Sequence, residues 1–240
     1  MRKNDWQERT RLLLGEKNVE VLNRSSVLVA GLGGVGGYAA EALCRAGVGR
    51  LLLADSDRYM ASNRNRQNGA FLSTEGQLKT EVIMSRLKDI NPEVSLEVYN
   101  GYLKDEAIPG IMENNIDYVL DAIDTLSPKV YLIKEAIERQ LPLVSSMGAG
   151  GRLDPGMVRV ADISESFGCP FAQAVRKKLY GLGIRSGFRV VFSPEPVIRS
   201  SVIVTDNSPN KKSTVGTVSY MPAIFGFTAA SVVIRSLCEG

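Results

Sequence analysis

The chain has 240 residues, of which 44% are hydrophobic and 23% are charged, and its formal net charge is +3. This is the composition of a soluble globular protein with a sizeable core, and the small positive charge permits a nucleic-acid partner without requiring one. The absence of histidine excludes Ser-His-Asp and Cys-His catalysis as well as any histidine-ligated metal.

The three cysteines, Cys44, Cys169 and Cys238, are far apart and form no CxxC pair, which excludes a four-cysteine zinc site and favours a reducing cytosol. The first residues, MRKNDWQERTR, contain no apolar stretch, so we expect no signal peptide and a cytoplasmic location. The uncharged run 218–234 is barely long enough to span a membrane and contains Pro222 and Gly226. We therefore predict a buried core helix there rather than a membrane contact.

Short apolar strands alternate with helical patterns up to residue 150. The predicted strands are Ser26–Ala30, Arg50–Ala54, Val94–Tyr99, Tyr118–Asp121 and Leu143–Ser146, and the predicted helices are Val35–Ala46, Gly76–Ile90, Lys104–Glu113 and Pro128–Gln140. This alternation predicts an α/β fold with a Rossmann-like, doubly wound and mainly parallel sheet. In such sheets, ligands bind beyond the carboxyl ends of the strands, where the strand order reverses.

After residue 150 the pattern changes. Short strands at Val158–Ala161 and Phe188–Phe192 flank a basic segment at 175–178, a polar loop spans Thr205–Thr214, and a final helix is predicted at Ala223–Leu237. We expect one domain over residues 1–240, with a nucleotide-binding core at 1–150. Residues 151–240 then pack back onto the sheet as a substrate-side extension.

The glycine-rich turn after the first strand points to a nucleotide. Gly31, Gly33 and Gly36 match G-x-G-x-x-G between a strand and a helix, with Gly34 in the same turn. Glycines permit the tight turn, the approach of a phosphate to the backbone and the close packing of helix on strand. Asp55, at the end of the second strand, can accept hydrogen bonds from a ribose. These features do not distinguish NAD from ATP.

The polar segment after Asp55 favours a triphosphate. It contains Asp57, Asn63 and three arginines, among them Arg66. A triphosphate needs more neutralising charge than a dinucleotide, because pyrophosphate must leave. Lys79 falls in the first turn of a predicted helix, where a cation opposes the helix dipole, so we interpret it as a phosphate ligand. The alternative is a solvated surface lysine.

A second carboxylate follows the strand that ends at Asp121. Asp124 would lie at the carboxyl edge of the sheet and face the phosphates, which would repel it unless a cation bridged them. Mg²⁺ is such a bridge, since it binds one or two carboxylates together with phosphate oxygens. Alternatively, Asp124 caps the following helix.

The stretches GLGGVG, SNRNRQ, GQLKTE and DAIDT, in this order, resemble the ubiquitin-activating, ThiF/MoeB-type superfamily of ATP-dependent adenylating enzymes. The resemblance implies that Gly33 and its neighbours hold the α-phosphate and that Asp55 holds the ribose. It also implies that Asn63, Arg66 and Lys79 bind the phosphates of ATP and that Asp124 binds Mg²⁺. Arg9 would act as a further catalytic residue, supplied by the N-terminal helix of a homodimer partner.

The stretches SMGAGGRLDP, GCPFAQAVRKKL, RVVFSPEP and VGTVSYMPAIFGF resemble one branch of that superfamily, the dehydratases of threonylcarbamoyladenosine in tRNA. This implies that ATP activates a carboxylate of the modified base, which then cyclises with loss of water. Cys169 stands where that branch is expected to have an acidic residue, which raises the hypothesis of a sulfur-transfer cysteine and a sulfur-relay partner. No histidine or second cysteine is adjacent to activate it.

The tRNA partner requires basic residues, and the candidates all lie in the C-terminal third: Arg152, Arg176, Lys177, Lys178, Arg185, Arg189, Lys211 and Lys212. They could equally form a solvated basic face. The main alternative function is adenylation of the C-terminal glycine of a ubiquitin-like sulfur-carrier protein. An NAD-dependent dehydrogenase and a non-catalytic nucleotide-binding module remain further alternatives.

Overall fold

The chain folds around one seven-stranded sheet, seen in a computed structural model that describes residues 6–103, 107–113, 115–204 and 213–239. The strand order is β3-β2-β1-β4-β5-β7-β6. All neighbours are parallel except β6, which pairs antiparallel with β7 at one edge. The strands are β1 (Ser26–Ala30), β2 (Arg50–Ala54), β3 (Ser95–Tyr99), β4 (Tyr118–Asp121), β5 (Leu143–Ser146), β6 (Arg159–Asp162) and β7 (Arg189–Phe192). The predicted doubly wound α/β fold is confirmed.

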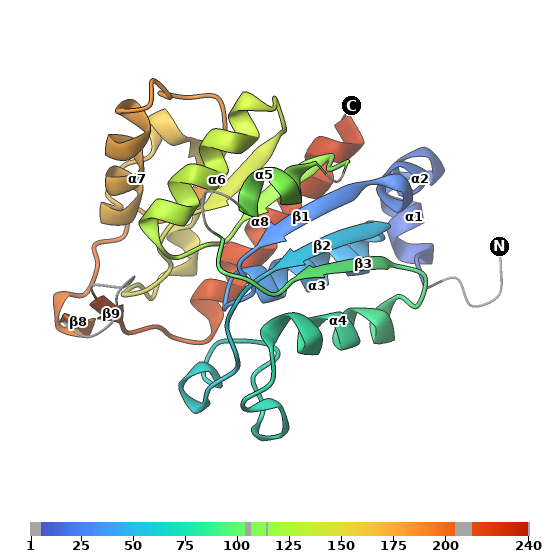
Figure 1. Cartoon of the computed structure of the whole chain (residues 1–240), viewed down its shortest axis with the longest axis horizontal. Coiled ribbons are helices and arrows are strands. Elements are labelled where there is room, and N and C mark those ends of the chain that lie inside the picture. The colour runs from blue at the N-terminus through green and yellow to red at the C-terminus, as the bar shows by residue number, and fades with distance from the viewer. Residues whose placement is uncertain (1–5, 104–106, 114, 205–212, 240) are drawn as a thin grey trace.

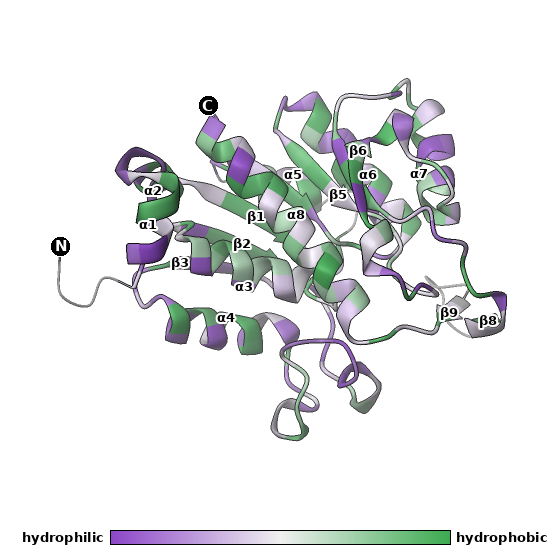
Figure 2. Ribbon diagram, turned by 180° about the vertical axis from the view of Figure 1, so that it is seen from behind, coloured by the Kyte–Doolittle hydropathy of each residue, from purple (hydrophilic) through white to green (hydrophobic). Residues whose placement is uncertain are grey.

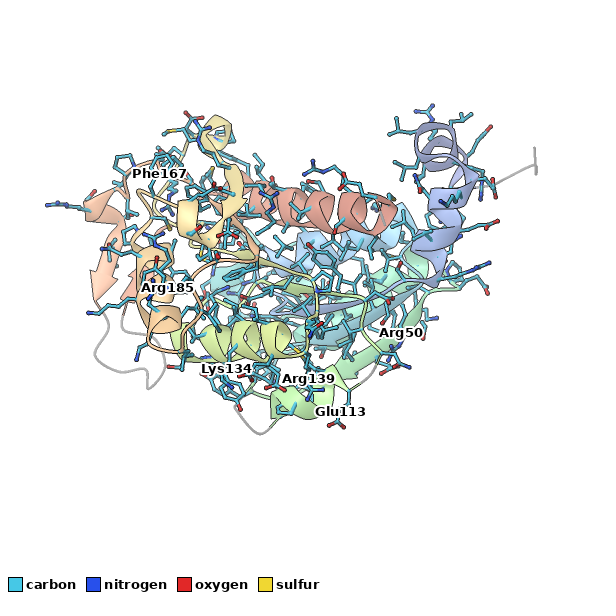
Figure 3. All side chains as sticks on the ribbon, turned by 90° about the horizontal axis from the view of Figure 1, so that it is seen from above. Arg50, Glu113, Lys134, Arg139, Phe167 and Arg185 are labelled. Atoms are coloured by element: carbon cyan, nitrogen blue, oxygen red, sulfur yellow. The ribbon has the colours of Figure 1, made fainter. Side chains whose placement is uncertain are left out.

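Helices cover both faces of the sheet (Figure 1). Apolar residues of β1 alternate between two core clusters, with Val27 and Val29 on one face and Leu28 and Ala30 on the other. The first cluster is completed by α2 (Glu16–Arg24), α3 (Gly36–Ala46), α4 (Lys79–Ile90) and α8 (Tyr220–Glu239), and the second by α5 (Ala107–Met112), α6 (Leu126–Glu138) and α7 (Pro170–Tyr180). Figure 3, seen from above, shows α8 and α6 on opposite sides of the strands.

The first 150 residues follow the predicted alternation closely. Four of the predicted strands have the predicted bounds, and β3 begins one residue later, at Ser95. The helix predicted from Gly76 begins instead at Lys79, because Gly76 has φ of +82° and the backbone of Leu78 is still extended. This makes Lys79 the first helical residue. The helix predicted from Lys104 is described from Ala107 only, since residues 104–106 lie outside the described residues.

The C-terminal third continues the same sheet through β7 and β6. Sequence analysis missed α2, α7 and the antiparallel pair β8 (Val202–Val204) and β9 (Ser213–Val215), and it expected an N-terminal helix around Arg9 without giving the bounds of α1 (Glu8–Leu14). The predicted loop at Thr205–Thr214 therefore ends inside a strand, and residues 205–212 lie outside the described residues. The division of the chain at residue 150 stays a prediction.

Helix α8 is long and apolar enough to cross a membrane by length and composition alone, with a mean hydropathy of 1.5. It packs instead along α3 and the sheet, where Met221, Phe225 and Val233 are fully buried. A Cβ on Gly226 would lie 2.4 Å from the carbonyl oxygen of Val35, so the two helices touch at the glycine. This packing agrees with the predicted core helix. Figure 2 shows its hydrophobic residues beside those of α3.

Candidate nucleotide site at the carboxyl edge of the sheet

Three loops meet where β1, β2 and β4 end. The glycine loop, residues 31–36, follows β1 and abuts the loop after β4: Gly31 has φ of +88°, and a Cβ there would lie 2.9 Å from the carbonyl oxygen of Ala122. A Cβ on Gly36 would lie 1.7 Å from the carbonyl oxygen of Gly31, so helix α3 can start this close to the strand only at a glycine. The turn therefore has the geometry that the motif predicts.

The space over Gly33 is open. A Cβ on this glycine would meet a single side-chain atom within 4 Å, Nε2 of Gln67, at 3.8 Å. The N-cap residue of α3, Val35, gives the helix no side-chain capping bond. An anion over this turn would meet the positive end of the helix dipole, with Gln67 the nearest side chain to Gly33.

Asp55 braces the glycine loop from β2. Its two carboxylate oxygens accept hydrogen bonds from the backbone nitrogens of Leu32, at 2.6 Å, and Asp57, at 2.7 Å. Burial raises the pKa of the Asp55 carboxyl, an effect that the charge of Lys79 opposes. Each oxygen keeps lone-pair capacity for a further donor, so the predicted ribose role is compatible with this bracing.

The arm, residues 56–68, carries polar side chains back over the glycine loop. Figures 1 and 2 show the arm and residues 69–78 projecting from the strand ends as two loops. Asn68 fastens the arm to α3 through the carbonyl oxygen of Gly37, at 3.1 Å, and the carboxylate of Glu41, at 3.1 Å. The backbone carbonyl of Arg66 would lie 3.2 Å from a Cβ on Gly34. The arm thus forms one wall of the candidate site.

Two predicted phosphate ligands, Asn63 and Arg66, lie in this arm. Asn63 is 9% exposed and accepts a hydrogen bond from the backbone nitrogen of Met60 at 3.0 Å. Arg66 donates to the carbonyl of Ser62 at 2.8 Å and to Oδ1 of Asn65 at 2.9 Å. Gln67, which sequence analysis missed, is 8% exposed, and its Oε1 has no hydrogen-bond partner among the described residues.

Lys79 is a buried cation at this edge. It is 5% exposed, and its Nζ lies 2.7 Å from Oδ2 of Asp57. The alternative of a solvated surface lysine is wrong. Because the Asp57 side chain is 66% exposed, water can solvate that carboxylate when another anion takes Lys79. The structure thus brings together Lys79 and Asp57, two of the residues predicted to bind the nucleotide, and their role in binding it stays a prediction.

Asp124 lies in the loop after β4, two residues before α6, and is exposed. The N-cap position of α6 belongs to Thr125 rather than to Asp124. The backbone nitrogen of Ala122, in the same loop, donates to the carbonyl of Ala30 at 2.8 Å, just before the glycine loop. Within the described residues no group of three or more acidic or cysteine side chains could hold a metal. A magnesium ion here would fit one carboxylate and the phosphates themselves.

A buried ion pair supports this loop from below and was not predicted. Asp121 and Lys129 are both fully buried, and Lys129 Nζ lies 2.6 Å from Oδ2 of Asp121. Ser145 Oγ donates to the same oxygen at 2.6 Å, and the backbone nitrogen of Ile123 donates to Oδ1 at 3.0 Å. Burial lowers the pKa of Lys129, while Asp121 opposes that effect. Asp121 thereby ties the loop that carries Asp124 to the sheet.

Comparison with known proteins agrees with this geometry. The model of the ThiF family matches residues 7–240. The chain belongs to the ThiF family. A tRNA threonylcarbamoyladenosine dehydratase of Bacillus subtilis is 40% identical over 96% of this chain and 94% of that protein. A crystal structure of the Escherichia coli enzyme TcdA in complex with ATP has a TM-score of 0.89 at 31% identity, covering 100% of this chain and 97% of the other.

A more distant ThiF-type relative matches over less of the chain. The molybdopterin-synthase adenylyltransferase of Salmonella typhimurium is 36% identical, but over 62% of this chain and 59% of that protein. The superfamily resemblance drawn from the sequence motifs is confirmed. The full-length matches favour the dehydratase branch over the sulfur-carrier activators.

Within a single chain, Arg9 lies away from the candidate nucleotide site and cannot play the role that the family resemblance predicts. Arg9 is an exposed residue of α1, and neighbouring Gln7 packs against Gly47, at the amino ends of the strands. Figure 1 shows α1 at the end of the sheet opposite the glycine loop. An arginine acting from a partner subunit is compatible with this position and stays a prediction.

The predicted tRNA contacts fall into four groups. Lys177, Lys178, Arg185 and Arg189 are exposed, as a phosphate-binding face requires. Arg176 is partly buried and donates to the carbonyl of Ser166 at 2.6 Å. Arg152 is 3% exposed, so its assignment to a solvated basic face is wrong. Lys211 and Lys212 lie outside the described residues.

Cys169 is 3% exposed and packs in the apolar cluster between the sheet, α6 and α7. It occupies the N-cap position of α7 without a side-chain capping bond. A cysteine that transfers sulfur needs access to a donor, and this burial provides none. The hypothesis of a sulfur-relay partner stays a prediction.

Proposed function

We propose that this chain is an ATP-dependent adenylating enzyme that converts threonylcarbamoyladenosine in tRNA to its cyclic form with loss of water. The observation that carries the proposal is the full-length match to tRNA threonylcarbamoyladenosine dehydratases, joined to a site in which buried Lys79 and exposed Asp124 flank the glycine loop. The fold, the open turn over Gly33 and the ATP held by the matching TcdA structure all support ATP as the activating substrate.

The reaction has two steps. A carboxylate oxygen of the threonylcarbamoyl group attacks the α-phosphorus of ATP, the bond to the β-phosphate breaks, and pyrophosphate leaves. The carbamoyl group of the same molecule then attacks the carbonyl carbon of the acyl-adenylate, loses a proton and expels AMP, which retains one oxygen of the original carboxylate. The second step is intramolecular, so positioning contributes much of the rate and no enzyme nucleophile is needed.

This chain's own residues bind and orient the charges. Gly33 and the start of α3 hold the α-phosphate, Asp55 holds the ribose and Lys79, released from Asp57, pairs with the phosphates. Asn63 and Arg66 contact the outer phosphates from the arm. Asp124 would hold magnesium, which neutralises charge on the phosphates when bound.

The test is incubation with MgATP and tRNA that carries threonylcarbamoyladenosine, followed by digestion to nucleosides and mass spectrometry. We expect a product lighter by one water, with one AMP and one pyrophosphate released per product. Unmodified tRNA and omission of ATP are the controls. Intact modified nucleoside after incubation with folded protein and MgATP would contradict the proposal.

The sulfur-carrier alternative is tested in the same assay. The match to a molybdopterin-synthase adenylyltransferase covers 62% of this chain, but the sequence has no CxxC pairs. Exchange of pyrophosphate into ATP that is triggered by a carrier protein ending in Gly-Gly, and not by modified tRNA, would support the alternative instead.

We propose a homodimer in which Arg9 acts on the partner's phosphates. The α1 residues beside it, Leu12 and Leu13, are 75% and 84% exposed, which leaves an apolar surface for a second copy. Mixing an Arg9→Ala variant with a Lys79→Ala variant tests this, since one site of each mixed dimer would regain both residues. Recovery of activity on mixing is expected, and its absence would contradict action across subunits.

We propose that the protein acts in the cytoplasm and that its tRNA substrate lies across α6 and α7. A hollow of about 310 Å³ between these helices is lined by Tyr131, Lys134 and Lys178. Figure 3 shows Lys134 on the same side of the molecule as Arg185, in the loop after α7. Phosphate contacts by these cations predict binding that weakens steeply with salt, and each removed cation should reduce the salt slope by about one.

A further inference from the structure

A separate pocket of about 450 Å³ lies beside the arm. Its walls come from three distant parts of the chain: the arm, the loop after β5, and the segments that flank the β8–β9 pair. The lining includes Asn65, Arg152, Leu153, Ile198, Thr217 and Ser219. Its volume is that of a small-molecule site.

Backbone hydrogen bonds hold these walls together. The nitrogen of Gly151 donates to the carbonyl of Gly216 at 2.8 Å, and the nitrogen of Ile198 donates to the carbonyl of Gly151 at 2.9 Å. The hydroxyl of Tyr220 donates to the carbonyl of Leu153 at 2.8 Å. Hydrogen bonds thus connect the walls of the pocket to one another.

Arg152 is a buried cation that lines this pocket. It is 3% exposed, and its Nε donates to the carbonyl of Glu195 at 3.2 Å. Its Nη1 donates to the carbonyls of Gly148 and Gly150. Among the described residues its Nη2 has no hydrogen-bond partner, and no carboxylate lies within salt-bridge distance. A buried guanidinium without a counter-charge is costly, so this arrangement suits an anionic ligand.

The pocket adjoins the candidate phosphate site. Asn65 lines the pocket, and its side chain joins the two: Nδ2 donates to the carbonyl of Thr217 at 3.0 Å, while Oδ1 accepts from Arg66 at 2.9 Å. Ser219 lines the pocket three residues before Pro222, whose Cβ would lie 3.0 Å from a Cβ on Gly34 in the glycine loop. One wall of the pocket is thus shared with the arm, and another leads to the start of α8, which packs against the glycine loop.

We propose that this is the acyl pocket: it receives the carboxylate-bearing side chain of the modified nucleoside, and Arg152 donates a hydrogen bond to that carboxylate. The inference rests on the proposed function. It assigns to Arg152 the selection of a substrate that has a free carboxylate. A carboxylate held through one oxygen keeps the other free to attack the α-phosphorus. The bond that forms is carboxylate oxygen to phosphorus, and the bond that breaks releases pyrophosphate.

The test measures discrimination between an acid and its ester. Wild-type protein is titrated with two anticodon stem-loop RNAs, one that carries threonylcarbamoyladenosine and one that carries its methyl ester. Loss of a charge-assisted hydrogen bond should make the ester bind about 10- to 100-fold more weakly. In Arg152→Gln the two RNAs should bind alike, while the affinity for ATP stays within about twofold because the nucleotide contacts are separate.

Two further variants keep the result interpretable. Arg235→Gln, an exposed arginine of α8, should retain the wild-type ratio of acid to ester. Ser219→Leu adds bulk at an exposed position on the pocket wall and should weaken binding of the acid RNA without changing ATP affinity, even if Arg152→Gln fails to fold. Equal binding of acid and ester by wild type, or an unchanged ratio in Arg152→Gln, would overturn this inference but leave the proposed function in place. Failure of wild type to bind or cyclise the acid RNA with MgATP would overturn the proposed function, and the inference with it.

Discussion

Two lysine–aspartate pairs lie near the same sheet edge and differ in their access to water. Lys79 and Asp57 pair at 2.7 Å beside the glycine loop, where the Asp57 side chain is 66% exposed. Lys129 and Asp121 pair at 2.6 Å beneath the loop after β4, with both side chains at 0% exposure. The pairs share their chemistry and distance, yet only the first has a partner that water can solvate.

The difference separates a pair that can exchange ligands from one that cannot. Releasing Asp57 to solvent costs little, so Lys79 can turn to a phosphate during each turnover. Releasing Asp121 would leave a charge in the core, so Lys129 keeps its partner and holds the loop of Asp124 in place. The pair that supports the loop differs from the pair that can bind phosphate in the burial of both partners, and not in the distance between them.

The largest effect is expected in the buried pair. Lys129→Met leaves Asp121 charged and buried, which should lower the free energy of unfolding by about 3–5 kcal/mol. Adding Asp121→Asn should recover part of that loss, because the charge is removed as well. Urea denaturation measures both, and Lys134→Met on the same helix, which breaks an exposed pair with Glu138, is the control. A loss under about 1 kcal/mol for Lys129→Met would contradict the strict burial of the pair.

Lys79→Ala should sharpen the contrast, because it removes function more than stability. Loss of a cation from the transferring phosphates should lower kcat/KM about 10²–10³-fold, equivalent to about 2.7–4 kcal/mol. The measurement is formation of AMP with modified tRNA. Lys88→Ala, near the other end of α4, is the matched control and should keep near-normal turnover. Near-normal turnover in Lys79→Ala itself would remove its phosphate role.

Asp124→Ala tests whether the loop held by the buried pair serves a metal. We expect turnover to fall about 100-fold, since a metal that stabilises phosphate charge contributes several kcal/mol to the transition state. The magnesium concentration for half-maximal rate should also rise. Titration of rate against magnesium measures this, with Asp117→Ala at the amino end of β4 as a carboxylate removed far from the site. An unchanged magnesium dependence would assign Asp124 another role.

The smallest effect is expected for Asp57→Asn. Because the Asp57 carboxylate is mostly solvated and the nearby Asp55 carboxylate still interacts with buried Lys79, the free energy of unfolding should fall by about 1 kcal/mol or less. Urea denaturation beside Asp121→Asn compares the two aspartates directly. If Asp57→Asn lost as much stability as Asp121→Asn, the two pairs would not differ in the way proposed here.

The sequence predicted best those elements whose pattern lies within a few consecutive residues. The glycine turn and the strands β1, β2, β4 and β5 were predicted with their bounds, because glycine requirements and apolar runs are local properties. Helix α7 was missed, although Pro170 at its first position and buried residues at 172, 175 and 179 carry helical spacing. The basic residues of its last turn drew the interpretation toward a binding segment instead.

Family, fold class and the order of the phosphate-site motifs therefore came from the sequence by itself, since they depend on residue types at short spacings. Tertiary structure alone decided which charges are buried. Asp121 and Lys129 meet across eight positions only because β4 and α6 pack together, and Arg152 lies inside a pocket although its sequence neighbours resemble those of a surface loop. Access to water is set by the whole fold, and it determines what each charge can do.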